Sequence, residues 1–360
     1  MKVLLVIRGV GKEGAGKMAL SLMNVLAEKN YEIAVLSYNQ NEAIEGLHEN
    51  IRHYRGTKNS GMLEYLYTIN RISSVVKDFR PNILIAFRDN AAGLAILSNK
   101  LYCLNVPVII CERTDPYMET NLLLYLSRKL FRFAAGGVFQ TREAWNYYKK
   151  LVKNYAIIPN PVMPVDVICS QNFEKRADEI VNVARLNLKQ KRQDILLRAF
   201  DIVTEKYPFM KLCFYGSGSD IDQLKQLVQE LGIEKNVMFY GCVSDISKRL
   251  VNSKIFVLSS DYEGISNALI EAMSMGLPCI STDTSPGGAR ILIDDGNNGF
   301  IVPCGDYKAL ADKILYYIEH PSVADAHGKK AKEIVDLYAP NVIFSMWEKF
   351  LLNTINKYHK

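Results

Sequence analysis

The sequence predicts an α/β protein built from two Rossmann-like, doubly wound domains. Short apolar runs typical of strands alternate with amphipathic helical patterns along the 360 residues, which is the signature of parallel sheets covered by helices. The alternation is interrupted once, by a segment with three prolines between positions 159 and 164, and then begins again. A chain of this length also exceeds one ordinary hydrophobic core. We therefore expect two domains that face a cleft, with ligands beyond the carboxyl ends of the strands.

In the first domain, residues 1–163, the expected strands alternate with helices. Amphipathic patterns predict helices over residues 15–29 and 62–79, and Pro81 ends the second one. A third helix is expected between the last two strands. The strands are residues 2–7, 33–37, 83–87 and 106–111.

The second domain, residues 164–341, repeats the pattern. Its predicted helices include residues 195–206 and 221–231 and a helix that begins near Ser266. An aromatic-rich helix over residues 342–357 follows Pro340, and we expect this segment, residues 342–360, to pack back on the first domain. The strands of the second domain are residues 180–184, 211–215, 237–240, 255–258, 278–282 and 299–302.

Composition narrows the setting in which the protein works. No apolar run approaches the roughly 20 residues that span a bilayer, and the N-terminus lacks the apolar core of a signal peptide. The seven cysteines are scattered without a CxxC pair, which indicates reduced thiols in a cytoplasmic protein and no metal site. Residues 1–163 hold 21 Lys+Arg and 13 Asp+Glu, a net charge of +8, whereas the remainder carries −2. The basic half suggests an anionic partner there, the alternative being an ordinary solvated surface.

The most informative segment is residues 259–273, which hold two glutamates with seven residues between them. Glu263 lies in a loop after an apolar strand, and Glu271 lies inside the helix that begins near Ser266. A helix N-terminus offers N–H groups and positive potential to an anion, while carboxylates accept hydrogen bonds from hydroxyls. The segment predicts a pocket for an anionic ligand that also carries hydroxyl groups.

A second basic motif supports this pocket. Arg185 follows the first strand of the second domain, and Lys191 precedes the next helix. From these two places the side chains can hold a diphosphate from two sides. Solvated loop residues are the alternative, weakened because Glu263 and Glu271 independently predict an anion in the same domain.

Two motifs point elsewhere and are rejected. Residues 11–18 have the glycine and lysine spacing of a P-loop, but Met18 stands where a serine or threonine would ligate magnesium. The segment is interpreted as a glycine turn, or as a loop whose backbone approaches a phosphate. Asp220 and Asp222 have the spacing of a metal-binding pair, yet they open a helix and are better explained as helix caps and dipole partners.

Taken together, five elements in order make the chain resemble the retaining glycosyltransferases of family 4, which have the two-domain GT-B fold. The likeness extends to the subgroup that builds bacterial capsular polysaccharide, exopolysaccharide and lipopolysaccharide. It covers nearly the whole chain and is densest between residues 181 and 305. The elements are Ala184-Arg185-Leu186 with Lys191, Phe214 to Gly218, Phe239 to Val243, Glu263-Gly264 through Glu271-Ala272, and Gly299-Phe300.

The resemblance implies a role for each matching position. Arg185 and Lys191 would neutralise the diphosphate leaving group; Lys191 lies one residue further along than usual, so Lys189 is a rival. Glu263 would face the donor sugar, and Glu271 would accept hydrogen bonds from the ribose. Further contacts to the nucleotide sugar are implied for Gly14, Gly216, Gly218, Val243, Gly264, Ile265, Ser266, Asn267, Ala268 and Leu269.

The first domain matches the family less well. Of the family's Gly-Gly-Ala-Glu loop only Gly14 and Ala15 agree. Where many relatives carry a histidine, this chain has Glu112 and Arg113, which are the candidates for acceptor-side chemistry. A structural salt bridge between these two residues is the alternative.

The function implied is transfer of a hexose or N-acetylhexosamine, with retention, from a nucleotide-diphosphate sugar, UDP being favoured. The acceptor would be a saccharide or a polyprenyl-diphosphate-linked saccharide, and neither a metal nor another cofactor is required. A nucleotide-sugar epimerase or a phosphorylase on the same scaffold is the alternative. Nucleic acid is not an expected partner, because the basic half lacks the interleaved aromatic and basic residues of RNA-binding sheets.

One segment of the basic domain suggests contact with a membrane. Residues 121–133 are apolar and basic at helical spacing, which is typical of an interfacial helix on an anionic surface. Such a helix would bring a lipid-linked acceptor within reach at the inner face of the cell membrane. The alternative is a core-facing helix with a basic outer side.

Overall fold

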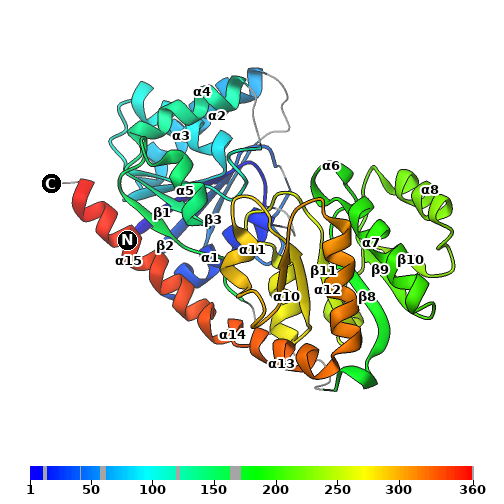
Figure 1. Cartoon of the computed structure of the whole chain (residues 1–360). Coiled ribbons are helices and arrows are strands. Elements are labelled where there is room, and N and C mark those ends of the chain that lie inside the picture. Colours follow the sequence, from blue (N-terminus) through cyan, green and yellow to red (C-terminus); the bar gives the residue numbers. More distant parts are fainter. Residues whose placement is uncertain (11–13, 41, 57–61, 119–121, 163–171, 359–360) are drawn as a thin grey trace. The chain divides into compact units, whose positions relative to one another are not determined.

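The computed structural model describes residues 1–10, 14–40, 42–56, 62–118, 122–162 and 172–358. The chain divides into two compact units, Met1–Pro161 with Asn341–Lys360, and Val162–Pro340 (Figure 1). Each unit contains one sheet, and all recorded strand pairs in both sheets are parallel. The prediction of two parallel-sheet α/β domains is confirmed.

The sheet of the first unit has the order β3-β2-β1-β4-β5-β6-β7. Chain order reverses between β1 and β4, as in a doubly wound fold. The strands are β1 (Lys2–Ile7), β2 (Glu32–Ser37), β3 (Arg52–Arg55), β4 (Ile83–Phe87), β5 (Val108–Cys111), β6 (Gly136–Phe139) and β7 (Tyr155–Ile157). The helices are α1 (Gly14–Glu28), α2 (Met62–Phe79), α3 (Asp89–Leu101), α4 (Leu122–Lys129), α5 (Arg142–Tyr148) and the 3-10 helix η1 (Leu130–Phe133).

The last helix, α15 (Pro340–Tyr358), completes the first unit. Trp347 on α15 is fully buried and stacks on Phe87 of β4, with 6.3 Å between the ring centroids. Glu348 accepts hydrogen bonds from Lys29 Nζ at 2.8 Å and from the Tyr31 hydroxyl, next to the end of α1. Figure 1 shows α15, in red, running along this part of the unit. The aromatic face of α15 therefore belongs to the core of the first unit.

The sheet of the second unit has the order β10-β9-β8-β11-β12-β13, with the reversal between β8 and β11. Its strands are β8 (Ala177–Val183), β9 (Lys211–Tyr215), β10 (Val237–Gly241), β11 (Ser253–Leu258), β12 (Cys279–Thr282) and β13 (Phe300–Val302). Its helices are α6 (Leu188–Lys191), α7 (Gln193–Lys206), α8 (Ile221–Leu231), α9 (Ile246–Leu250), α10 (Asn267–Met275), α11 (Gly288–Leu292), α12 (Tyr307–Glu319), α13 (Pro321–Ala331), α14 (Ile334–Leu337) and η2 (Phe173–Lys175).

Both faces of the second sheet are buried. Along β11, Ile255 and Val257 join one hydrophobic cluster, while Phe256 and Leu258 join another. Side chains of a strand alternate between faces, so a sheet covered on both sides reads as a continuous apolar run. This is why β11 could be predicted from the sequence.

Three strands of the first sheet were not predicted. β3 has the sequence RHYR at one edge, β6 begins with two glycines, and β7 has three residues at the other edge. Polar edges, glycines and short length each remove the apolar pattern on which a strand prediction depends.

Candidate functional site

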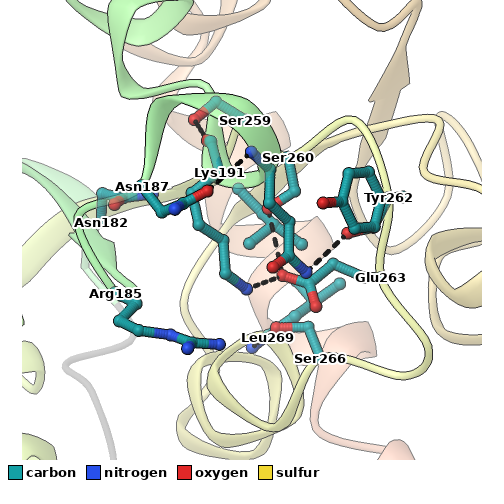
Figure 2. Close-up of polar contacts among 12 residues, drawn as sticks. Asn182, Arg185, Asn187, Lys191, Ser259, Ser260, Tyr262, Glu263, Ser266 and Leu269 are labelled. Atoms are coloured by element: carbon teal, nitrogen blue, oxygen red, sulfur yellow. Dashed lines mark hydrogen bonds and ion pairs between the residues drawn. The ribbon is translucent and has the colours of Figure 1, made fainter. Parts of the chain in front are cut away.

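The predicted anion site of the second unit lies where its chain order reverses. Arg185 comes two residues after β8, and the loop of residues 259–266 follows β11, the neighbouring strand. The carboxyl ends of parallel strands meet at one edge, and the reversal leaves a crevice there that is the usual ligand site of such sheets. Arg185 is exposed, and in the view of Figure 2 its side chain extends toward Lys191 and Glu263.

Lys191 and Glu263 form an ion pair at this edge. Lys191 ends α6, and its Nζ contacts Glu263 Oε1, which also accepts a hydrogen bond from Ser260 Oγ at 3.1 Å (Figure 2). The two side chains are 14% and 12% exposed, so both charges are largely removed from water. Lys189, its rival from the sequence, is exposed. Residues 72 positions apart are therefore joined by charge.

Hydrogen bonds between the two loops hold the pair in place. Asp261 N donates to Gln190 O at 2.9 Å, and Gln190 Nε2 donates to Tyr262 O at 3.1 Å. Ser259 Oγ donates to Lys191 O at 2.8 Å. The β11–α10 loop is thus hydrogen-bonded to Gln190 and Lys191, which fixes the position of the backbone that carries the Lys191 side chain.

Arg192 adds an ionic link beside these bonds. Its guanidinium lies 3.1 Å from Asp194 Oδ2 and 2.9 Å from Asp261 Oδ2. Hydrogen bonds first to Asp194 and then to Asp261 raise the pKa of Arg192 above its usual value, so the guanidinium keeps its charge. Arg192 has φ 48° and ψ 44°, the left-handed region that disfavours most side chains, and the two carboxylates help to hold it there.

The N-terminus of α10 faces the same loop. Ser266 is the N-cap, and its side chain accepts a hydrogen bond from Leu269 N at 3.4 Å. Asn267 begins the helix, Glu271 lies half-buried one turn further on, and Ile265 is buried. The segment from Glu263 to Asn267 therefore has the Lys191 amine of α6 at one end, held by Glu263, and the positive end of the α10 dipole at the other.

Gly216 and Gly218 have a packing role that the sequence did not reveal. A Cβ at Gly216 would lie 2.0 Å from the carbonyl oxygen of Ala184, and one at Gly218 would lie 2.0 Å from that of Leu186. The β9–α8 loop thus rests directly on the backbone that carries Arg185. Val243, after β10, is half-buried against the core next to α10.

Gly288 is a site residue that sequence reasoning missed. A Cβ there would lie 1.6 Å from the carbonyl oxygen of Gly264, and Glu263 N donates to Ser285 O at 2.8 Å. The segment that leads into α11 therefore packs directly against the Glu263–Gly264 backbone and supports it. The adjacent pair Gly287-Gly288, which opens α11, was the signal available in the sequence.

Asp222 lies in the first turn of α8, as expected of a helix-dipole partner, whereas Asp220 occupies the N-cap position but is not a side-chain cap. The Asp220 side chain makes no capping bond to α8; instead Asp220 Oδ2 accepts from Leu188 N at 2.7 Å, at the start of α6. The Ser219 hydroxyl and the Leu188 N–H hold the pKa of Asp220 below its usual range. Asp220 supports the short helix that ends in Lys191.

The predicted residues of the first unit have other settings. Gly14 begins α1 with φ +52°, and Met18 is buried; residues 11–13 of the P-loop-like segment lie outside the described residues. Glu112 is 2% exposed, and both oxygens of its carboxylate accept hydrogen bonds. Oε1 accepts from Arg113 N, Thr114 N and Thr114 Oγ1, and Oε2 accepts from the Tyr148 hydroxyl.

Arg113 turns away from Glu112. Its Nη1 donates to Asn160 Oδ1 at 3.1 Å, and the guanidinium lies 5.6 Å from the ring centre of Trp347 on α15. Among the residues that the structure describes, no ion pair joins Glu112 and Arg113, so the salt-bridge alternative is wrong in that form. Arg113 instead links the segment after β5 to Asn160, near the end of residues 1–161, and to Trp347 of α15.

Comparisons with known proteins identify the class. Residues 168–334 match the family model described as Glycosyl transferases group 1. Over 251 residues the chain is 31% identical to an uncharacterized glycosyltransferase of Methanocaldococcus jannaschii, an alignment that covers 63% of this chain and 62% of that protein.

Two further matches extend over the whole chain. A Campylobacter jejuni protein named as an α-1,4-N-acetyl-D-galactosaminyltransferase acting on a PP-undecaprenol-linked saccharide is 23% identical over 99% of both chains. The crystal structure of Anabaena HepE in complex with UDP has a TM-score of 0.82 to this structure at 19% identity, covering 98% of this chain and 100% of that chain. The fold is therefore GT-B. The chain carries a glycosyl transferases group 1 domain in its second unit, and the resemblance drawn from the sequence is confirmed at this level.

The contact between Gly288 and Gly264 yields a test of the site's framework. We expect Gly288→Ala to lower the free energy of unfolding by about 3 kcal/mol, because the added methyl overlaps a backbone oxygen that cannot move alone. Gly241→Ala is the control: Gly241 has φ +68° and open space around a Cβ, so only backbone strain of about 1 kcal/mol is added. Urea denaturation measures both, and equal losses would contradict the close contact.

Proposed function

We propose that the protein is a retaining glycosyltransferase that moves a hexose or N-acetylhexosamine from a nucleotide-diphosphate sugar. The observation that carries the proposal is the Lys191–Glu263 pair, set between Arg185 and the N-terminus of α10. Cationic groups beside a helix N-terminus suit a diphosphate, and a carboxylate at their edge suits sugar hydroxyls. UDP is the favoured nucleotide; the similar fold of HepE was crystallised with UDP.

Each residue of the site then has a task. Arg185 and Lys191 bind the diphosphate, Glu263 binds the donor sugar, and Glu271 binds the ribose. Lys191 is preferred to Lys189 for the diphosphate because the loop bonds direct it to Glu263. The remaining donor contacts are proposed for Gly14, Gly216, Gly218, Val243, Gly264, Ile265, Ser266, Asn267 and Leu269.

The chemistry proposed is a substitution on one face of the sugar. The bond from the anomeric carbon to the diphosphate breaks, a phosphate oxygen takes the proton of the acceptor hydroxyl, and that hydroxyl attacks from the same side. Negative charge grows on the diphosphate, so Arg185, Lys191 and the α10 dipole stabilise the transition state more than the bound donor. These groups supply positive charge in the place of a metal, and we propose that the reaction needs none.

The acceptor proposed is a saccharide or a polyprenyl-diphosphate-linked saccharide in the synthesis of surface polysaccharide. The Campylobacter jejuni relative, which is named for a PP-undecaprenol-linked substrate, supports this class. The alternative is an epimerase or phosphorylase on the same scaffold. Product analysis with a labelled UDP-sugar, with and without acceptor, separates them, because only a transferase makes the label's fate depend on the acceptor.

We expect Glu263→Ala and Lys191→Ala each to lower kcat/KM by about tenfold or more, since each removes a group that acts on developing charge or on the sugar. Steady-state kinetics with the donor measure the loss, and circular dichroism checks that the variants fold. Lys189→Ala is the matched control, two positions from Lys191 and exposed, and should keep normal turnover. Normal turnover by either site variant would refute the assignment.

The structure also supports the proposed contact with an anionic membrane. Leu122, Leu123, Tyr125 and Leu126 of α4 are between 50% and 72% exposed, whereas Arg128 is buried. The outer side of α4 is thus mainly apolar, and its exposed cation, Lys129, lies in the last turn of the helix. Among the described residues, no helix is both long enough and apolar enough to cross a membrane.

Cations surround this apolar face. Lys129 Nζ lies 4.5 Å from the Tyr125 ring, and Lys100 Nζ lies 4.9 Å from the ring of Phe133, which is itself 49% exposed. Apolar side chains that enter the headgroup region, flanked by lysines, are the pattern of an interfacial helix on anionic lipid. We propose that α4 and η1 rest on the inner face of the cell membrane.

Vesicle flotation tests this contact. The wild type should float with vesicles of phosphatidylcholine and phosphatidylglycerol, and the triple variant Leu122→Ser, Leu123→Ser, Leu126→Ser should stay in solution, because each leucine loses about 1.5 to 3 kcal/mol of apolar burial. Leu337→Ser, at a 65% exposed leucine of the other unit, is the control and should float. Flotation of the triple variant, or none by the wild type, would contradict the proposal.

A further inference from the structure

Two arginines occupy the point of chain reversal in the first sheet. Arg8 comes directly after β1 and Arg88 directly after β4. The parallel register pairs Val6 with Ala86, so the next positions but one, Arg8 and Arg88, lie level at the carboxyl edge of neighbouring strands. This is the edge at which doubly wound sheets bind ligands.

Arg88 holds a backbone conformation that suits glycine. Its φ is 74° and its ψ is 156°, a region populated almost only by glycine. Hydrogen bonds fix it on both sides: Arg88 N donates to Cys111 O at 2.9 Å, and Ala92 N donates to Arg88 O at 3.0 Å. Glycine would adopt this conformation without strain, so the backbone itself does not call for an arginine here.

Arg8 is exposed, but an ion pair with Glu64 holds its guanidinium. Its Nε lies 3.3 Å from Glu64 Oε1, and its side chain is 62% exposed. Glu64 is 7% exposed and also accepts a hydrogen bond from Asn39 Nδ2 at 2.9 Å. The buried carboxylate therefore orients the guanidinium and leaves much of it open to solvent.

Tyr38 follows β2, the strand next to β1, and is buried near this edge. It is 2% exposed, and Arg8, Glu64 and Arg88 lie near enough to act electrostatically on its hydroxyl. Burial raises the pKa of Tyr38 well above its usual range, so the hydroxyl stays protonated and adds no negative charge. Around it two guanidinium groups outweigh one carboxylate, in a half of the chain with a net charge of +8 over residues 1–163.

We propose that Arg8 and Arg88 form an anion subsite that binds a phosphate or diphosphate group carried by the acceptor. Guanidinium groups match phosphate oxygens in pairs, and the thirteen-residue helix α3, which begins directly after Arg88, adds N–H groups at the same edge. This inference rests on the proposed function and names the chemical class of its acceptor. Arg8 and Arg88 also take the place of Glu112 and Arg113 as the acceptor-side candidates, because the polar groups of Glu112 and Arg113 form hydrogen bonds within the first unit.

Calorimetric titration of the full chain tests the subsite with UDP at saturation, so that the donor's diphosphate groups are already bound. Inorganic pyrophosphate is the probe. We expect Arg88→Gly and Arg8→Ala each to weaken its binding by about tenfold or more, the loss of one charge-assisted contact. Geranyl diphosphate and glycerol 1-phosphate then distinguish a lipid-linked diphosphate from the phosphate of a polymer, by which of them binds more tightly.

Arg80→Gly is the matched control. Arg80 is also an exposed arginine with positive φ, 54°, but it lies at the opposite, amino end of β4. Both glycine variants should have a Tm equal to or above that of the wild type, because each removes the same kind of backbone strain. Only Arg88→Gly should lose pyrophosphate binding, so stability and binding move in opposite directions.

The outcomes separate this inference from the proposed function. A wild type that does not bind UDP would refute the proposed function itself. Normal UDP affinity, together with pyrophosphate binding that is absent in the wild type or unchanged in Arg88→Gly and Arg8→Ala, would overturn the subsite alone. A lower Tm of Arg88→Gly would assign Arg88 a structural role and would also overturn it.

Discussion

The ion pair between Lys191 and Glu263 is the interaction on which the rest of the second unit's site depends. It joins a loop after β8 to a loop after β11, the two strands where chain order reverses, with both side chains mostly removed from water. Three hydrogen bonds between the loops and the Arg192 carboxylate contacts give the pair one geometry. A charged pair at such low exposure is costly unless other groups complete it, and Ser260 does so here.

Close backbone contact is the second constraint. Gly216, Gly218 and Gly288 each let one loop rest on a carbonyl oxygen of another, and each lies next to a segment that carries a proposed site residue. A methyl group at any of them would separate loops whose bonds depend on distances near 3 Å. The same site therefore requires charge in two places and the absence of side chains in three.

The sequence predicted the donor-side arrangement better than the acceptor side, for physical reasons. The strands around the second site are apolar on both faces, and Glu263 with Glu271 has a spacing that fixes one in a loop and one on a helix. Arg8 and Arg88 left no such signal, because they are 80 positions apart and only the register of β1 on β4 brings them level. Glu112 and Arg113 misled because adjacency in sequence says nothing about burial, and both side chains turned out to be buried and engaged within the unit. Gly288 left only its pairing with Gly287 as a signal, since its partner is a backbone oxygen.

The central claim is that the Lys191 amine, held beside Glu263, is part of a diphosphate site. The most direct measurement compares the affinities of UDP and of uridine for the wild type and for Lys191→Met. We expect the substitution to weaken the affinity for UDP by about tenfold or more, which corresponds to one charge-assisted contact, and to leave the affinity for uridine unchanged. Equal affinity of the two proteins for UDP would contradict it.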